Sequence, residues 1–136
     1  MAMMNFNLQD RIVLTSEIIG MEDHLPSFNI SMEVKQFITS SNRVIFQFDS
    51  LWFAREAWDS FLKCLFSVND EFKASLFDLS SEVNITISKS GNGSVLFIGL
   101  NNSNINGRLS SAYSQVIEED ELAIIKNSAK RFATWW

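Results

Sequence analysis

The alternation of apolar and polar residues along most of the chain is the feature that most constrains the fold. Between residues 28 and 35 every second residue is apolar: Phe28, Ile30, Met32 and Val34. A period of two recurs near 6–19, over 43–48, 71–79, 82–89 and 94–100, and more weakly over 105–113. Successive side chains of a strand point to opposite faces, so the pattern predicts strands with one buried face. Polar stretches between the runs, such as SGNG at 90–93, predict hairpin turns.

Residues 50–66, SLWFAREAWDSFLKCLF, change to a helical period. The apolar positions recur at steps of three and four and form one stripe: Ala54, Ala57, Trp58, Phe61, Leu62, Leu65 and Phe66. This spacing predicts an amphipathic helix, with Asp49 or Ser50 as its N-cap. The stripe could line a ligand site or form the wall of a core. We favour the core, because large aromatic side chains chiefly serve burial.

Cys64 is the only cysteine of the chain and borders this stripe. A reactive thiol needs a nearby cation or a helix N-terminus to favour the thiolate, whereas Cys64 lies near the other end of the expected helix. The only histidine, His24, falls in a distant loop. We therefore expect Cys64 to be inert and partly buried.

The C-terminal segment is again helical in period. Its apolar stripe comprises Leu122, Ile125, Ala129, Phe132 and Trp136, widened by Ile124 and Ala133. Acidic residues at 118–121 precede basic residues at 126, 130 and 131, which is the order that the helix dipole favours. The acidic run could instead be a metal site, but four consecutive side chains fan around a helix and cannot converge on one ion. Helix initiation is the interpretation that we keep.

The expected order of elements is βββαββββα. Consecutive hairpins predict a mostly antiparallel sheet of about six or seven strands, and two amphipathic helices would cover one of its faces. The fold class is therefore α+β. A chain of 136 residues fits one domain over 1–136, and we expect the first four residues to be disordered.

Composition narrows the possible functions. A net charge of −5 argues against direct nucleic-acid binding, which needs a cationic face, and it permits a basic partner. No signal peptide and no run of about 20 apolar residues is readable, and one cysteine makes no internal disulfide, so we expect a cytoplasmic protein that does not enter a membrane. With one histidine, one cysteine and no convergent acid pair, we expect no enzyme, no cofactor and no metal site.

Four segments carry a resemblance to a known family. They are LTSEIIGMEDHLPSFNISMEVKQF, FQFDSLWFAREAWDSFLKCLF, NITISKSGNGSVLFIGLN and IEEDELAIIKNSAKRF, and the resemblance extends across roughly residues 10–133. In this architecture the chain resembles bacterial toxin-immunity proteins, both the WapI-like kind and those paired with contact-dependent growth-inhibition toxins. It departs from them in having less glycine and proline around the first loop.

The resemblance implies a stoichiometric inhibitor that binds a cognate toxin domain, such as a nuclease, and occludes its active site. The toxin would be basic, and the chain itself a monomer or a weak homodimer. Acidic residues outside the apolar faces are the candidate partner surface: Glu22, Asp23, Asp70, Glu71, Asp78 and Glu82. The alternative is a carrier of a small apolar ligand, with a cavity between the sheet and the C-terminal helix.

Overall fold

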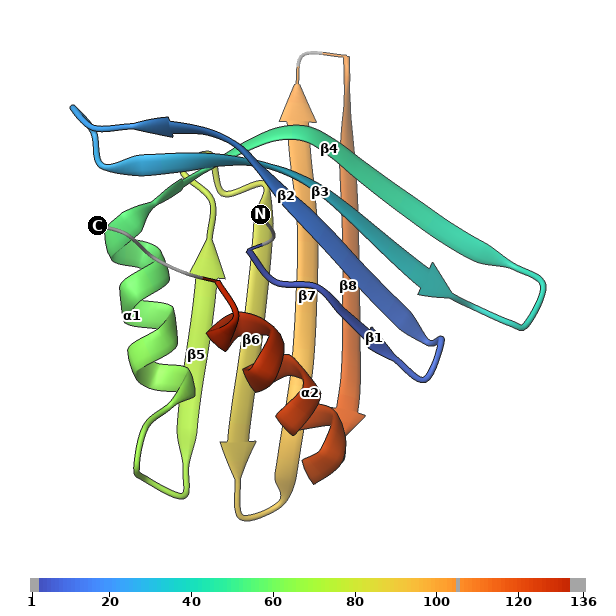
Figure 1. The fold of residues 1–136 in the computed structure, drawn as a ribbon. Coiled ribbons are helices and arrows are strands. Elements are labelled where there is room, and N and C mark those ends of the chain that lie inside the picture. The colour runs from blue at the N-terminus through green and yellow to red at the C-terminus, as the bar shows by residue number, and fades with distance from the viewer. Residues whose placement is uncertain (1–2, 105, 133–136) are drawn as a thin grey trace. The chain divides into compact units, whose positions relative to one another are not determined.

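The computed structural model describes residues 3–104 and 106–132. It confirms the α+β class, with eight antiparallel strands in two four-stranded sheets and two helices in the order ββββαββββα (Figure 1). The elements are β1 (Phe6–Leu8), β2 (Ile12–Glu22), β3 (Ser27–Phe37), β4 (Arg43–Ala54), α1 (Arg55–Leu65), β5 (Phe72–Phe77), β6 (Val83–Ser90), β7 (Gly93–Asn104), β8 (Gly107–Ile117) and α2 (Glu119–Lys130).

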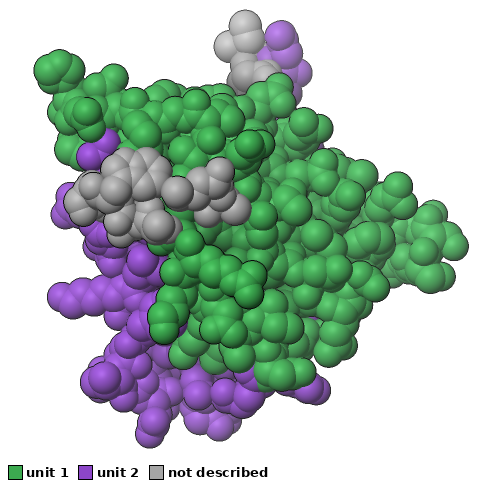
Figure 2. Space-filling view, viewed as in Figure 1, with its two compact units in different colours: residues 1–52, 120–136 green, residues 53–119 purple. Residues whose placement is uncertain are grey.

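The chain divides into two compact units, coloured separately in Figure 2. Unit 1 comprises residues 1–52 and 120–136, and unit 2 comprises residues 53–119. Each unit contains one sheet, so the single sheet that the sequence predicted is in fact two. The expectation of one domain over 1–136 stays a prediction.

The first sheet has the strand order β1-β2-β3-β4. Where we expected one strand near 6–19, a tight turn at Gln9 and Asp10 separates β1 from β2. Both residues have positive φ, 52° and 57°, and the Arg11 N–H donates to the Leu8 carbonyl at 3.0 Å, as in a type I′ turn. Asn7 holds the turn, because its side-chain oxygen accepts from the Asp10 N–H and its Nδ2 donates to Asp10 Oδ1, both at 2.9 Å.

Strands β2 and β3 form a long hairpin in which the predicted alternation holds. Val34 pairs with Leu14 and Ile30 with Ile18, and the apolar residues predicted for 28–35 are all buried. Met3 and Met4, which we expected to be disordered, are also buried. The Met4 N–H donates to Ser16 Oγ, and this hydroxyl donates to the Met4 carbonyl, both at 3.0 Å. Residues 1 and 2 lie outside the described part of the chain.

Strand β4 continues to Ala54, so the predicted helix start at Asp49 or Ser50 is wrong. The period of two persists there, with Leu51 and Phe53 buried on either side of the exposed Trp52. Ser50 does not cap a helix, since its hydroxyl donates to Asn29 Oδ1 at 2.8 Å. Ala54 is the N-cap and makes no side-chain hydrogen bond.

Helix α1 lies along β5 in unit 2 and confirms the core interpretation of its stripe. Trp58, Phe61 and Leu65 are buried, and the Trp58 and Phe61 rings pack with centroids 5.5 Å apart. Phe66 was predicted to join them, but it ends the helix as its C-cap and is 43% exposed.

The second sheet has the order β5-β6-β7-β8, and SGNG forms the β6–β7 turn as predicted. Ser90 pairs with Gly93, whose φ of 116° favours glycine. Buried residues alternate along three of its strands: Ala74 and Leu76 of β5, Val83, Ile85 and Ile87 of β6, and Leu96, Ile98 and Leu100 of β7. Of the segment 105–113, which was weakest in sequence, residues 107–113 belong to β8, which runs to Ile117, and residue 105 lies outside the described residues.

Helix α2 belongs, except for its first residue, to unit 1. The predicted stripe members Leu122, Ile125, Ala129 and Phe132 are buried, whereas Ile124 is exposed. Phe132 packs on Phe28 of β3 with ring centroids 5.6 Å apart. The predicted stripe positions Ala133 and Trp136 lie outside the described residues.

Candidate functional site

The tip of the β2–β3 hairpin carries the first two candidate acids. Glu22 ends β2 opposite Ser27, and residues 23–26 make the turn between the two strands (Figure 1). The Glu22 carboxylate accepts from the backbone N–H of His24 at 3.0 Å, which orders the turn locally. All residues from 22 to 26 are exposed, including Leu25, whose side chain is 75% exposed. We call residues 22–26 the hairpin tip.

A β-bulge lies just before the hairpin tip. The β2–β3 register shifts between Ile18 and Gly20, which leaves Ile19 as the extra residue of β2. A bulge bends its strand and redirects a side chain, and Ile19 is accordingly 51% exposed.

Asp70 and Glu71 lie in unit 2, in the exposed connection between α1 and β5. Glu71 is beside the β6–β7 turn, because a Cβ added to Gly91 would lie 4.0 Å from Glu71 Oε1. Both acids precede the first residue of β5 and are not part of a strand. Glu71 also borders a shallow groove between α1 and β5.

This groove has a volume of about 500 Å³ and is also lined by Lys63, Cys64 and Lys73. Cys64 is exposed, so the expectation that it is partly buried is wrong. On the helix it lies one residue from the buried Leu65 and points away from the core, as Lys63 does.

Asp78 and Glu82 occupy the β5–β6 connection at the opposite end of β5. Asp78 is buried, and its Oδ1 accepts from the Val83 N–H at 2.9 Å. Its carbonyl accepts from the Ser81 N–H at 3.1 Å, and Ser81 has a positive φ of 56°. Asp78 thus holds a turn, and it is not on the surface where we expected it. Glu82 is half-buried beside this turn.

The six candidate acids do not form one set. Glu22 and Asp23 belong to unit 1 and the other four to unit 2. Within unit 2, strand β5 separates Asp70 and Glu71 from Asp78 and Glu82 by six residues, about 20 Å. Two exposed acidic pairs remain as candidate surfaces, at the hairpin tip and at the α1–β5 connection.

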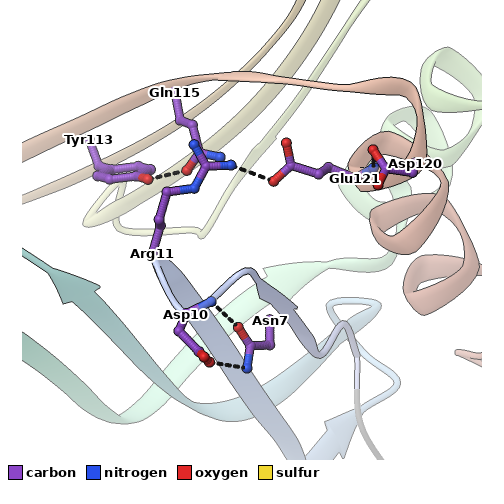
Figure 3. Close-up of polar contacts among 7 residues, drawn as sticks. All are labelled: Asn7, Asp10, Arg11, Tyr113, Gln115, Asp120 and Glu121. Carbon is purple, nitrogen blue, oxygen red and sulfur yellow. Dashed lines mark hydrogen bonds and ion pairs between the residues drawn. The ribbon is translucent and has the colours of Figure 1, made fainter. Parts of the chain in front are cut away.

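One acidic residue has a role that sequence reasoning missed. Glu121, part of the run interpreted as helix initiation, is buried in unit 1 and accepts a hydrogen bond from Arg11 at 2.7 Å (Figure 3). Its neighbour Asp120 does serve the helix start, since Asp120 Oδ1 accepts from the Glu121 N–H at 3.0 Å. Its partner Arg11 lies in a hairpin turn 110 positions away in the sequence, so no local pattern predicts this pairing.

Figure 3 also draws a polar contact on β8 of unit 2, where the Tyr113 hydroxyl donates to the Gln115 side-chain oxygen. The two residues are neighbours on one face of the strand and Gln115 is buried. This contact satisfies a buried amide oxygen and is structural in kind.

Two further hollows lie within the units, and both are open and shallow. One of about 220 Å³ lies on the first sheet beside Thr15, Glu17 and Gln47, and one of about 370 Å³ lies on the second sheet beside Asn84 and Arg108. Helix α2 lines neither of them, nor the groove beside Cys64. None of the three hollows is therefore the cavity that the carrier alternative describes.

Among the described residues, no three His, Cys, Asp or Glu side chains gather closely enough to hold a metal ion. In the same part of the chain, neither helix combines the length and the apolar character needed to cross a membrane. No protein-family model and no curated protein matches this sequence.

Proposed function

We propose that this chain is a bacterial immunity protein that binds a cognate toxin domain and occludes its active site. The toxin would be a contact-dependent inhibition effector such as a nuclease. The observation that carries the proposal is the hairpin tip, where the exposed acids Glu22 and Asp23 stand beside the exposed Leu25.

The hairpin tip combines the two components of a recognition site. Burying a leucine side chain contributes about 1.5–3 kcal/mol, so Leu25 can add apolar contact with a pocket of the partner. The two carboxylates suit a cationic surface, because complementary charges speed encounter and fix orientation. In a nuclease, they would occupy the places of substrate phosphates.

The backbone supports a preformed tip. Strands β2 and β3 each have 11 residues and pair over most of their length up to Glu22 and Ser27. The Glu22–His24 hydrogen bond adds order within the turn itself. A tip that is already ordered loses less conformational entropy on binding.

The test is co-expression with the toxin domain encoded directly upstream, the gene order that the family resemblance implies. Leu25→Ala combined with Glu22→Lys and Asp23→Lys should abolish protection of the host cells. The matched control, Asp70→Lys with Glu71→Lys, makes the same charge change in unit 2 and should protect as well as the natural sequence. Loss of protection in the control alone would move the site to the α1–β5 connection and overturn the tip assignment.

A second measurement separates immunity from transport. Native mass spectrometry of the purified protein should show the bare chain and, after mixing, a one-to-one complex with the toxin domain. A stoichiometric small molecule on the purified chain, together with no toxin complex, would contradict the proposal and favour the carrier.

A further inference from the structure

Strand β4 is an edge of the first sheet. The order β1-β2-β3-β4 gives it β3 as its neighbour on one side, and the other edge strand, β1, has only three residues. Along residues 43–49 the side chains are exposed or half-buried, with Val44 37% and Ile45 46% exposed. A long edge of this kind presents unpaired N–H and C=O groups that can pair with another strand.

We propose that residues 43–49 of β4 pair with the same residues of a second copy of this chain, antiparallel and centred on Phe46. In this register Arg43 lies opposite the partner's Asp49, and the reciprocal pair forms at the other end of the segment. Between the two ion pairs, Val44 faces Phe48 and Phe46 faces its own copy. Directly opposite side chains share a face of the sheet, so each pair is in contact.

The charge order of the segment RVIFQFD selects this occupant and this register. One cation begins the segment and one anion ends it, with five uncharged residues between them. An antiparallel copy matches both charges at once, whereas a parallel copy would place Arg43 on Arg43. If one copy shifts by two residues along the other, each side chain stays on the same face of the sheet but both ion pairs are lost. The charges therefore also define the register.

The dimer should be weak and dependent on concentration. One strand pair buries less than the roughly 800 Å² per partner of a stable interface, and each copy carries a net charge of −5. This inference does not rest on the proposed function, because β4 is distinct from the hairpin tip.

Sedimentation velocity over a concentration series tests the pairing. The natural chain should move from 15.5 kDa toward twice that mass as concentration rises. Arg43→Asp or Asp49→Arg alone places like charges opposite each other twice, and should raise the dissociation constant about tenfold or more. The double variant restores the complementarity in reverse, and its dissociation constant should return to within about threefold of the natural value.

The rescue can come only from contact between copies, because residues 43 and 49 are about 20 Å apart along one strand. Glu17→Arg, the same charge change on the exposed part of β2, is the control and should leave the dissociation constant unchanged. A chain that stays monomeric at millimolar concentration overturns the proposal. A dimer that ignores the single changes, or a double variant as weak as the singles, overturns it equally.

Discussion

Arg11 Nη2 donates to Glu121 Oε2 at 2.7 Å, with the Glu121 side chain 2% exposed and that of Arg11 46% exposed. The pair joins the β1–β2 turn to the first turn of α2 within unit 1 (Figure 3). A buried carboxylate loses its hydration, and a charge-assisted hydrogen bond from a guanidinium offsets part of that cost. Arg11 therefore matters chiefly because Glu121 is buried.

Arg11→Ala should lower the free energy of unfolding by about 1–3 kcal/mol. This loss is smaller than that expected on breaking a fully buried ion pair, because the Arg11 side chain is about half exposed. Urea denaturation measures this change. In a Glu121→Gln background the same substitution should cost clearly less, since the amide has no charge to satisfy. Equal costs in the two backgrounds would show that the two side chains are not coupled.

Trp58→Ala should lower the free energy of unfolding by about 3–5 kcal/mol, because it removes a fully buried ring and leaves a cavity. Trp52→Ala is the matched control, since this side chain is 37% exposed and its loss should cost clearly less. Both are measured by chemical denaturation. Similar midpoints for the Trp58 variant and the natural chain would contradict the core interpretation of α1.

The alternation of apolar residues was sufficient to predict the fold class and most of the strands, because each strand buries one face, but it missed the turn that divides residues 6–19 into β1 and β2. The same physics explains the error at the start of α1. Leu51 fits both a period of two and the helical stripe that continues at Ala54, whereas Phe53 fits only the period of two, and both are buried in the strand. Whether the strands form one sheet or two depends on pairings between distant residues, which local periodicity does not contain.

The candidate site was predictable only as a list of acids. The sequence predicts a loop around Glu22 and Asp23, and in the structure Glu22 ends β2, Asp23 lies in the turn, and both are exposed. Asp78 lies in a similar polar turn, but its carboxylate caps the Val83 N–H and is buried. Aspartate serves both purposes equally well, so composition alone does not separate a turn-forming acid from a surface acid.

Asp78→Ala should therefore affect folding, and not partner binding. The change leaves the buried Val83 N–H without its side-chain acceptor, and we expect a loss of about 1–3 kcal/mol in the free energy of unfolding. Asp70→Ala, at an exposed acid of the same unit, should stay within about 0.5 kcal/mol of the natural chain. Thermal or urea denaturation of the pair decides between the two roles, and equal stabilities would refute the assignment of Asp78.

Cys64→Ser should leave stability within about 0.5 kcal/mol of the natural chain, because the thiol is exposed and its replacement keeps a small polar group in solvent. Protection against the toxin should also be unchanged. Denaturation and the co-expression assay measure the two quantities. A folded Cys64→Ser protein without any activity would instead assign chemistry to the thiol.

Charge reversal at the hairpin tip, Glu22→Lys with Asp23→Lys, should act mainly on the rate of association with a basic toxin domain. Exposed rim charges steer encounter, whereas a buried and paired carboxylate controls dissociation and costs about 2–5 kcal/mol when removed. We therefore expect the variant to associate more slowly than the natural chain at low salt, with little change in the dissociation rate. The two association rates should converge as salt screens the charges. Surface plasmon resonance across a salt series separates the two rate constants. Faster dissociation at every salt concentration, with association unchanged, would mean that the acids lie in the centre of the interface and do not act by steering.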